Sequence, residues 1–203
     1  MIHQDRPYAP YNLPEELAWT AKYLADRQRI PPVKFKFPNP ARKKLQPVLE
    51  KMTANHCSYC DGFPMGVLTE RTIDHFFPRS RFPERAFAWD NLFLACHRCQ
   101  SRKGQEHDPL LLKPDVRTYR FEKFFIYCTV TGELQPNPSV RPKDQKRARA
   151  SIALLGLNSP ELRADRKRWF RNQAGRKQDE LPYRFMFPRL PKKVKSAMGT
   201  WEI

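Results

Sequence analysis

The chain has 203 residues, 40% of them hydrophobic, and its 38 Lys and Arg against 21 Asp and Glu give a formal charge of +17. This length allows one domain with extensions, or two small domains, around a buried core. No apolar run approaches the ~20 residues of a membrane span, so the sequence excludes a membrane-spanning protein. A charge this basic indicates a polyanionic partner such as nucleic acid, the alternative being a merely soluble basic surface.

The N-terminal residues and the cysteines predict a cytoplasmic protein. Charged and imidazole side chains at His3, Asp5 and Arg6, with several prolines, leave no apolar stretch of a secretory signal. Five cysteines occur as two Cys-x-x-Cys pairs and a single Cys128, which suits metal binding in a reducing compartment. We expect Cys128 to be a small buried side chain in a strand-like run, without a role of its own.

Residues 1–40 are expected to form a proline-rich arm with one helix. Apolar side chains recur at helical spacing between residues 14 and 30, and Pro31-Pro32 ends the pattern. Trp19 and Tyr23 need to be covered. The arm therefore either packs on the rest of the chain or docks a partner.

Residues 41–108 are expected to form the central domain. A helix is predicted after the start signal Asn39-Pro40, from the apolar spacing of Leu45, Val48, Leu49 and Met52. Because Pro47 breaks this pattern, the helix either starts near Gln46 or kinks at Pro47. Its expected task is to brace the first cysteine pair.

A hairpin and a short helix are predicted next. Residues 67–73 are rich in β-forming side chains and lead to Asp74-His75, a loop follows over residues 78–85, and residues 91–95 return as the second strand. Residues 96–103 would form the helix. On it, Cys96 and Cys99 are spaced i, i+3 and Cys96 and Gln100 i, i+4, so one short helix can serve two metal sites.

The two cysteine pairs predict a structural zinc site. Their thiols can bind one tetrahedral ion, and the ligands would be Cys57, Cys60, Cys96 and Cys99. Cys96 lies 36 positions after Cys60, a separation that excludes a compact zinc ribbon and fits an inserted hairpin. His56 adjoins the first pair and is a weaker alternative ligand.

A second set of candidate ligands, which includes hard oxygen donors, lies between and just after these cysteines. Asp74 stands beside His75, Asn91 begins the second strand and Gln100 follows the last cysteine of the second pair. Carboxylate and carbonyl oxygens suit a divalent cation such as Mg²⁺ or Mn²⁺, and an imidazole can act as a general base near neutral pH.

At these residues the chain resembles the HNH endonucleases. The segments I-D-H-F-F-P-R-S-R-F-P, A-F-A-W-D-N-L-F-L-A-C, C-Q-S-R-K-G and A-L-L-G-L-N are similar to the HNH enzymes of Septu and retron-linked anti-phage defence systems, over roughly residues 40 to 160. The resemblance implies an α+β fold: a ββα-metal core on a zinc site, flanked by N-terminal and C-terminal helices and an additional β-hairpin.

The resemblance also implies roles. His75 would be the general base, Asp74 and Gln100 would hold the catalytic Mg²⁺ or Mn²⁺, and Asn91 would fix the loop or orient the histidine. The family has His or Asn where this chain has Gln100, which leaves His97 as a competing ligand. Lys103 would either contact a phosphate or end the helix near its negative pole.

Residues 109–203 are expected to form a basic extension. A hairpin is predicted over residues 119–134 with its turn at Thr131-Gly132, then a helix over residues 141–155 ended by Gly156. Ser159-Pro160-Glu161 starts another helix in the preferred order of residues. The tail after Gly175 is expected to order on a partner.

Most of the excess charge lies in this extension. Residues 141–203 hold 17 Lys and Arg against 6 Asp and Glu, a difference of 11, with aromatic side chains interleaved. Such a run is either a solvated face or a nucleic-acid contact. The second interpretation selects as nucleic-acid-binding residues Arg79, Arg81, Lys103, Arg163, Arg166, Lys167, Arg168 and Arg171.

The leading hypothesis is a metal-dependent HNH endonuclease of the bacterial cytoplasm. By resemblance it would be the effector of an anti-phage defence system, working with an ABC-type ATPase and in some systems with a retron reverse transcriptase and its msDNA. One alternative is a zinc-dependent nucleic-acid-binding or scaffold protein with a decayed HNH site, suggested by Gln100. Another is a stand-alone restriction or homing enzyme. Phosphate contacts do not distinguish DNA from RNA as substrate.

Overall fold

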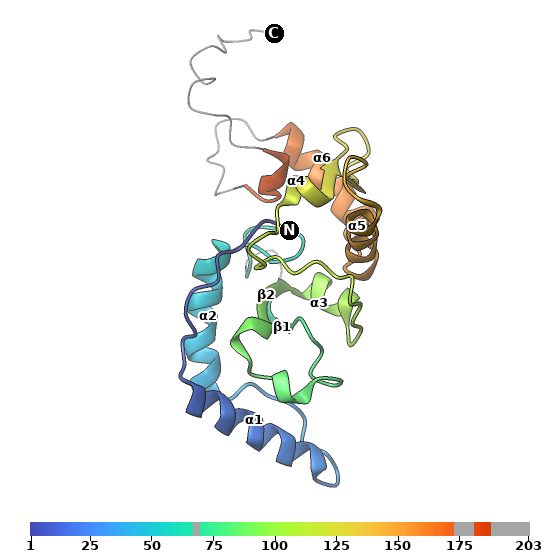
Figure 1. The fold of residues 1–203 in the computed structure, drawn as a ribbon. Helices are drawn as coiled ribbons and strands as arrows, with labels where there is room; N and C mark the ends of the chain where they lie inside the picture. Colours follow the sequence, from blue (N-terminus) through green and yellow to red (C-terminus); the bar gives the residue numbers. More distant parts are fainter. Residues whose placement is uncertain (67–69, 173–180, 188–203) are drawn as a thin grey trace.

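A two-stranded hairpin followed by a short helix forms the centre of the molecule (Figure 1). The computed structural model describes residues 1–66, 70–172 and 181–187. Strand β1 (Arg71–His75) pairs antiparallel with β2 (Leu92–Cys96), and α3 (His97–Lys103) follows directly. The hairpin ends bring Asp74 opposite Phe93 and His75 opposite Leu92.

Helices flank this ββα unit on both sides, which confirms the predicted α+β class. One side carries α1 (Leu13–Gln28) and α2 (Asn39–Thr53), at the bottom and left of the view in Figure 1. The other side carries α4 (Phe121–Phe124), α5 (Pro142–Leu154) and α6 (Pro160–Arg171). Short 3-10 turns are η1 (Pro83–Arg85), η2 (Trp89–Asn91) and η4 (Arg184–Met186).

Strand β2 is the most enclosed element of the hairpin. All five of its residues are buried, whereas β1 becomes buried only at Asp74 and His75. The first strand begins at Arg71, so it is shorter than the predicted run over residues 67–73; residues 67–69 lie outside the described part. Helix α2 packs on β2 from one side.

Both N-terminal helices form where the sequence predicts them. Asn12 caps α1 by accepting from the Glu15 amide at 2.9 Å, and the Glu15 carboxylate accepts from the Asn12 amide at 3.2 Å. Helix α2 starts at Asn39 and continues through Pro47, so the start near Gln46 is not the one adopted. The lost amide is offset by packing, since Leu45 and Leu49 are fully buried.

The segment before α1 runs along the central unit. Arg6 donates to Asp115 at 2.5 Å and to the Trp89 carbonyl at 2.7 Å, and its guanidinium lies 4.5 Å from the Phe93 ring centroid. Met1 and Tyr11 belong to the same hydrophobic core as β2 and α6. In the described residues the arm therefore packs on the chain itself. The domain boundaries at residues 40 and 108 stay predictions.

The predicted hairpin of the C-terminal extension is present but shorter. Strands β3 (Phe125–Tyr127) and β4 (Leu134–Pro136) pair antiparallel, whereas residues 121–124, expected to be strand, form α4. Phe121 and Phe124 are spaced i, i+3 and both point into the core, which a helical turn allows and a strand does not. Cys128 lies after β3 and is only half-buried, not fully buried as expected.

The predicted end of α5 and the predicted start of α6 are both confirmed. Gly156 ends α5 with φ of +58°, and the Leu157 amide donates to the Ile152 carbonyl at 2.9 Å. The Ser159 hydroxyl caps α6 through the Leu162 amide at 3.4 Å. Residues 173–180 and 188–203, which hold most of the tail expected to order on a partner, lie outside the described part. Across the described residues, no helix has the length and apolarity to cross a bilayer.

Candidate active site and zinc centre

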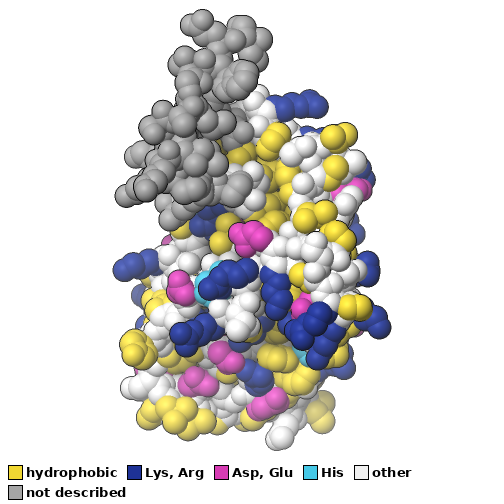
Figure 2. All heavy atoms as spheres, turned by 45° about the horizontal axis from the view of Figure 1, so that its top comes forward, with side chains coloured by type: hydrophobic (Ala, Val, Ile, Leu, Met, Phe, Trp, Pro, Cys, Tyr) yellow, Lys and Arg dark blue, Asp and Glu magenta, His cyan; other side chains and the backbone are white. Residues whose placement is uncertain are grey.

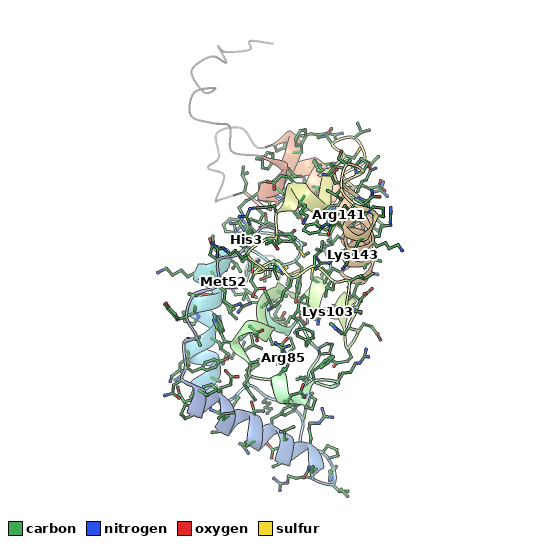
Figure 3. The ribbon with its side chains drawn as sticks, in the orientation of Figure 1. His3, Met52, Arg85, Lys103, Arg141 and Lys143 are labelled. Carbon is green, nitrogen blue, oxygen red and sulfur yellow. The ribbon has the colours of Figure 1, made fainter. Side chains whose placement is uncertain are left out.

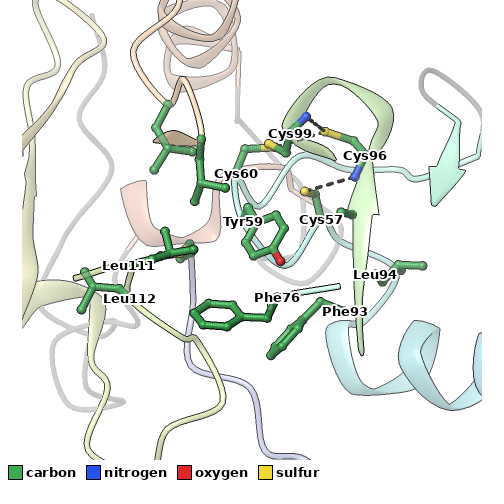
Figure 4. Packing of buried hydrophobic residues seen from close by; sticks show 14 of the residues in the cluster. Cys57, Tyr59, Cys60, Phe76, Phe93, Leu94, Cys96, Cys99, Leu111 and Leu112 are labelled. Carbon is green, nitrogen blue, oxygen red and sulfur yellow. Dashed lines mark hydrogen bonds between the residues drawn. The ribbon is translucent and has the colours of Figure 1, made fainter. Parts of the chain in front are cut away.

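The four paired cysteines meet at one point. Their sulfur atoms all lie within 4.8 Å of one another and all four residues are buried. Cys57 and Cys60 come from the turn after α2, Cys96 ends β2, and Cys99 lies in the first turn of α3 (Figure 4). Four converging thiols are the donor set of a structural zinc ion, so these residues fit the metal that the sequence predicts.

Backbone amides support the sulfur atoms. The Cys96 amide donates to Cys57 Sγ at 3.3 Å and the Cys99 amide to Cys96 Sγ at 3.5 Å (Figure 4). Burial alone would raise the pKa of Cys57, but hydrogen bonds from the other three thiols hold it well below the ordinary thiol value. Both ring nitrogens of His56 face backbone carbonyls, at 2.7 and 3.0 Å, so His56 is committed elsewhere and is not a fifth donor.

A C-terminal segment fastens the first cysteine pair. Arg184 donates to the buried Asp61 carboxylate from Nη2 at 2.6 Å and from its own amide at 2.6 Å. The Tyr183 amide donates to the Asp61 carbonyl at 2.8 Å. Residues 181–187, far along the sequence, thus hold the turn that carries Cys57 and Cys60.

The second set of candidate ligands lines a separate cavity of about 320 Å³. Asp74 and His75 enter it from the end of β1, and Gln100 enters it from α3. Arg79, from the loop after β1, lies on its wall. A larger cavity of about 510 Å³ lies elsewhere, between the zinc site and α6. The chemistry that the sequence predicts belongs to the smaller cavity, because the residues expected to be the base and the oxygen donors line it.

The geometry of His75 suits a general base. Its Nε2 lies 2.9 Å from the Ala86 carbonyl, which can only accept, so Nε2 carries the hydrogen and Nδ1 keeps its lone pair. The Phe37 ring stacks on the imidazole with centroids 5.5 Å apart, and Phe35 meets it edge-on at 5.6 Å. Burial lowers the pKa of His75 to about 4, so the imidazole is neutral at physiological pH.

Asp74 is held by two donors at the same oxygen. Tyr59 donates to Oδ2 at 2.6 Å and the Lys103 ammonium lies 3.1 Å from it. Burial raises the pKa of Asp74, and Lys103 and Tyr59 oppose that shift. Among the described residues no hydrogen bond reaches Oδ1, so this oxygen remains for another ligand.

Gln100 completes the oxygen donors. Its Nε2 donates to the Ile73 carbonyl at 3.2 Å, which leaves its Oε1 as the acceptor. His97, the competing candidate, is exposed and interacts with Ser101, and it does not line the cavity. One carboxylate and one carboxamide oxygen at one cavity fit the preference of Mg²⁺ or Mn²⁺ for hard oxygen ligands.

Asn91 fixes the loop that follows β1. Its Oδ1 accepts from the Phe77 amide at 2.7 Å, and its Nδ2 donates to the carbonyls of Phe77 at 3.1 Å and Arg85 at 2.8 Å. The side chain is fully buried. Asn91 thus joins the two ends of the loop that carries Arg79, and it does not reach the cavity itself.

Two of the residues selected for nucleic-acid contact need correction. Lys103 is 1% exposed and donates to the His75 carbonyl at 2.5 Å, at the buried end of α3 (Figure 3). Arg166 is fully buried and donates to the Leu157 carbonyl at 2.6 Å. Both are committed to the protein interior, because their charges compensate buried carbonyls or carboxylates rather than facing solvent.

The other selected basic residues reach the surface to different degrees. Arg79 and Arg163 are half-buried, and Arg163 pairs with Glu133 at 3.2 Å. Lys and Arg side chains are spread over the face seen in Figure 2, with a few acidic ones among them. The accessible members of the set are Arg79, Arg81, Arg163, Lys167, Arg168 and Arg171.

Sequence reasoning missed three residues of the site. Tyr59, Phe35 and Phe37 contact Asp74 or His75 directly, yet none lies in a motif with a catalytic meaning. The position of Tyr59 inside Cys-x-x-Cys was the available signal, since a residue between two metal ligands has a fixed backbone. Nothing in the sequence placed the two phenylalanines on His75.

This arrangement, a ββα unit bearing Asp-His on its first strand and a four-cysteine cluster at its base, matches a known domain. Residues 57–106 match the model of the HNH endonuclease family. The Septu protein PtuB of Bacillus thuringiensis is 28% identical over 145 residues, which cover 69% of this chain and 52% of that protein. The chain thus spans about half the length of this curated relative.

Proposed function

We propose that the protein is a metal-dependent endonuclease that hydrolyses phosphodiester bonds of nucleic acid. The observation that carries the proposal is the His75 imidazole, which lines the same cavity as Asp74 and Gln100 and whose Nε2 is bonded to the Ala86 carbonyl at 2.9 Å, so that Nδ1 stays unprotonated. The HNH domain over residues 57–106 supports it.

In this proposal each residue has a distinct task. His75 Nδ1 takes a proton from the water that attacks phosphorus, and the Ala86 carbonyl keeps the ring in the required tautomer. Asp74 Oδ1 and Gln100 Oε1 would hold Mg²⁺ or Mn²⁺. A bound divalent ion would supply electrostatic stabilisation of the negative charge that develops on the phosphate. The zinc site fixes β2 and α3 and takes no part in the chemistry.

We further propose a role in anti-phage defence in the bacterial cytoplasm, supported by the similarity to the Septu protein PtuB. The proposed protein partner is an ABC-type ATPase of the same system, and a retron reverse transcriptase with its msDNA is a second proposed partner. Native mass measurement of the co-expressed chains would test the ATPase. Failure to form any complex would contradict this part of the proposal.

Cleavage of labelled DNA and RNA tests the enzymatic part. The wild type and His75→Ala would be compared with Mg²⁺, Mn²⁺ or EDTA, with and without the ATPase. We expect cutting that needs the ion and is lost in His75→Ala. His97→Ala is the matched control, because His97 lies on α3, is exposed and does not line the cavity, so its loss should leave cutting intact.

Two results would contradict the proposal. Loss of cutting in both His75→Ala and His97→Ala would mean that the loss is not specific to His75. Salt-sensitive binding by zinc-loaded wild type without cutting under any condition would favour a binding or scaffold protein with a decayed site.

A further inference from the structure

Tyr59 connects the zinc centre to the candidate catalytic carboxylate. It lies between two zinc-ligand cysteines in Cys57-Ser58-Tyr59-Cys60, and its side chain is fully buried. Its hydroxyl donates to Asp74 Oδ2 at 2.6 Å. A short hydrogen bond between two buried groups thus joins the two metal sites.

The position of the Tyr59 hydroxyl is set by the cysteine turn. The Ser58 amide donates to the Leu94 carbonyl at 2.8 Å, which ties this turn to β2. The Tyr59 ring lies among buried aromatic side chains, with the Phe93 ring centroid 6.2 Å away (Figure 4). With Cys57 and Cys60 bound to one ion, the backbone of Tyr59 has no freedom to withdraw its hydroxyl.

This hydroxyl decides which oxygen of Asp74 faces the cavity. Tyr59 and Lys103 both contact Oδ2, so rotation of the carboxylate would break two interactions in a buried, weakly solvated place. The carboxylate is therefore held with Oδ1 left over for a ligand. Lys103 supplies the compensating charge, and Tyr59 supplies a directional bond from the zinc turn.

We propose that Tyr59 is a positioning residue that orients Asp74 for the catalytic divalent ion and makes this orientation depend on the zinc centre. The inference rests on the proposed function in taking Asp74 as a ligand of that ion. Partners that orient a metal ligand from behind typically change metal affinity by about 10- to 100-fold when removed.

The test compares Tyr59→Phe with the wild type and with Tyr119→Phe. Tyr119 is a matched control, because its hydroxyl is also buried but donates to the Met1 carbonyl at 3.0 Å, away from Asp74. On zinc-loaded protein, Mn²⁺ binding would be measured by electron paramagnetic resonance titration. Zinc content, melting temperature and the Mn²⁺ concentration for half-maximal cutting would be measured on the same samples.

We expect Tyr59→Phe to keep its zinc, to weaken Mn²⁺ binding about tenfold or more, and to raise the activating Mn²⁺ concentration in parallel. Tyr119→Phe should bind Mn²⁺ as the wild type does. Unchanged Mn²⁺ affinity in Tyr59→Phe would overturn the inference, as would loss of zinc from this variant, since Tyr59 would then serve the zinc turn alone.

The proposed function fails in a different way. If the wild type binds Mn²⁺ but cuts nothing, the endonuclease proposal is wrong, while the affinity ratio of the two tyrosine variants still decides the role of Tyr59. If the wild type does not bind Mn²⁺, Asp74 is not a ligand, and both proposals are overturned.

Discussion

Replacing Phe37 with alanine should raise the pKa of His75. The Phe37 ring stacks on the imidazole with an interplanar angle of 10°, and burial is the main reason why the pKa of His75 lies at about 4. Removal of this ring opens one face of the imidazole to water and reduces the cost of charging it. We expect an upward shift of about one unit or more, toward the ordinary value of about 6.5.

The difference between the pKa of buried His75 and the ordinary pKa of histidine sets how the protonated fraction and the stability change with pH. At pH 5.5 an imidazole with a pKa of about 4 is about 3% protonated, and one with a pKa of about 6.5 is about 91% protonated. Above pH 6.5 neither the folded nor the unfolded chain takes up this proton, whereas between pH 6.5 and 4 only the unfolded chain does. Stability therefore falls as the pH drops through this window, by about 3 kcal/mol at its limit.

Proton–carbon correlation spectra of histidine-labelled protein would measure this pKa. The His75 signal is identified by its absence in His75→Gln, and titrated from pH 8 to 5. The wild-type signal should stay nearly constant over this range, and the Phe37→Ala signal should move. Phe82→Ala is the control, because the ring contacts of Phe82 in the described residues are to Phe77 and His107. A wild-type midpoint near 6.5 would refute the reasoning.

Three further predictions concern the metals and the charges. Cys99→Ser should lose the zinc and lower the melting temperature sharply, as checked by metal analysis and calorimetry, because a structural zinc site contributes directly to folding. Lys103→Met should destabilise the fold by about 3–5 kcal/mol in urea unfolding at pH 7, since it leaves the buried Asp74 carboxylate without its cation. Arg79→Ala should lower the cutting rate, because Arg79 lines the cavity, whereas exposed Arg81→Ala should weaken nucleic-acid binding and reduce its salt dependence by about one unit of slope.

Local signals in the sequence were sufficient for the helix ends and for the clustering of the four paired cysteines. Ser159 caps α6 and Gly156 ends α5 as predicted, because a helix cap depends only on the few residues beside it. The two cysteine pairs could be predicted to come together in space, because four thiols satisfy one tetrahedral ion. The strand before Asp74 and the helix after Cys96 follow from the same local rules.

Burial of charge could not be predicted in this way. Arg166 stands in a run of basic residues on α6, and its neighbours in sequence are accessible, yet it is fully buried against the Gly132 and Leu157 carbonyls. Lys103 resembles an ordinary helix-ending lysine until β1 brings Asp74 within 3.1 Å. In both cases the partner comes from a distant part of the chain, and helical periodicity contains no information about it.

The length of α3 explains why the zinc and the chemistry belong together. A helix of seven residues is too short to be stable alone in water, because nucleation is costly and few hydrogen bonds follow. Here Cys96 and Cys99 fix its first turn, and Lys103 fixes its last residue to the His75 carbonyl at 2.5 Å. Gln100 lies between these two fixed ends. We therefore expect its carboxamide to hold a constant position opposite β1 only while the sulfur cluster is intact, so a zinc ion bound there would be a condition for the candidate active site rather than a distant structural support.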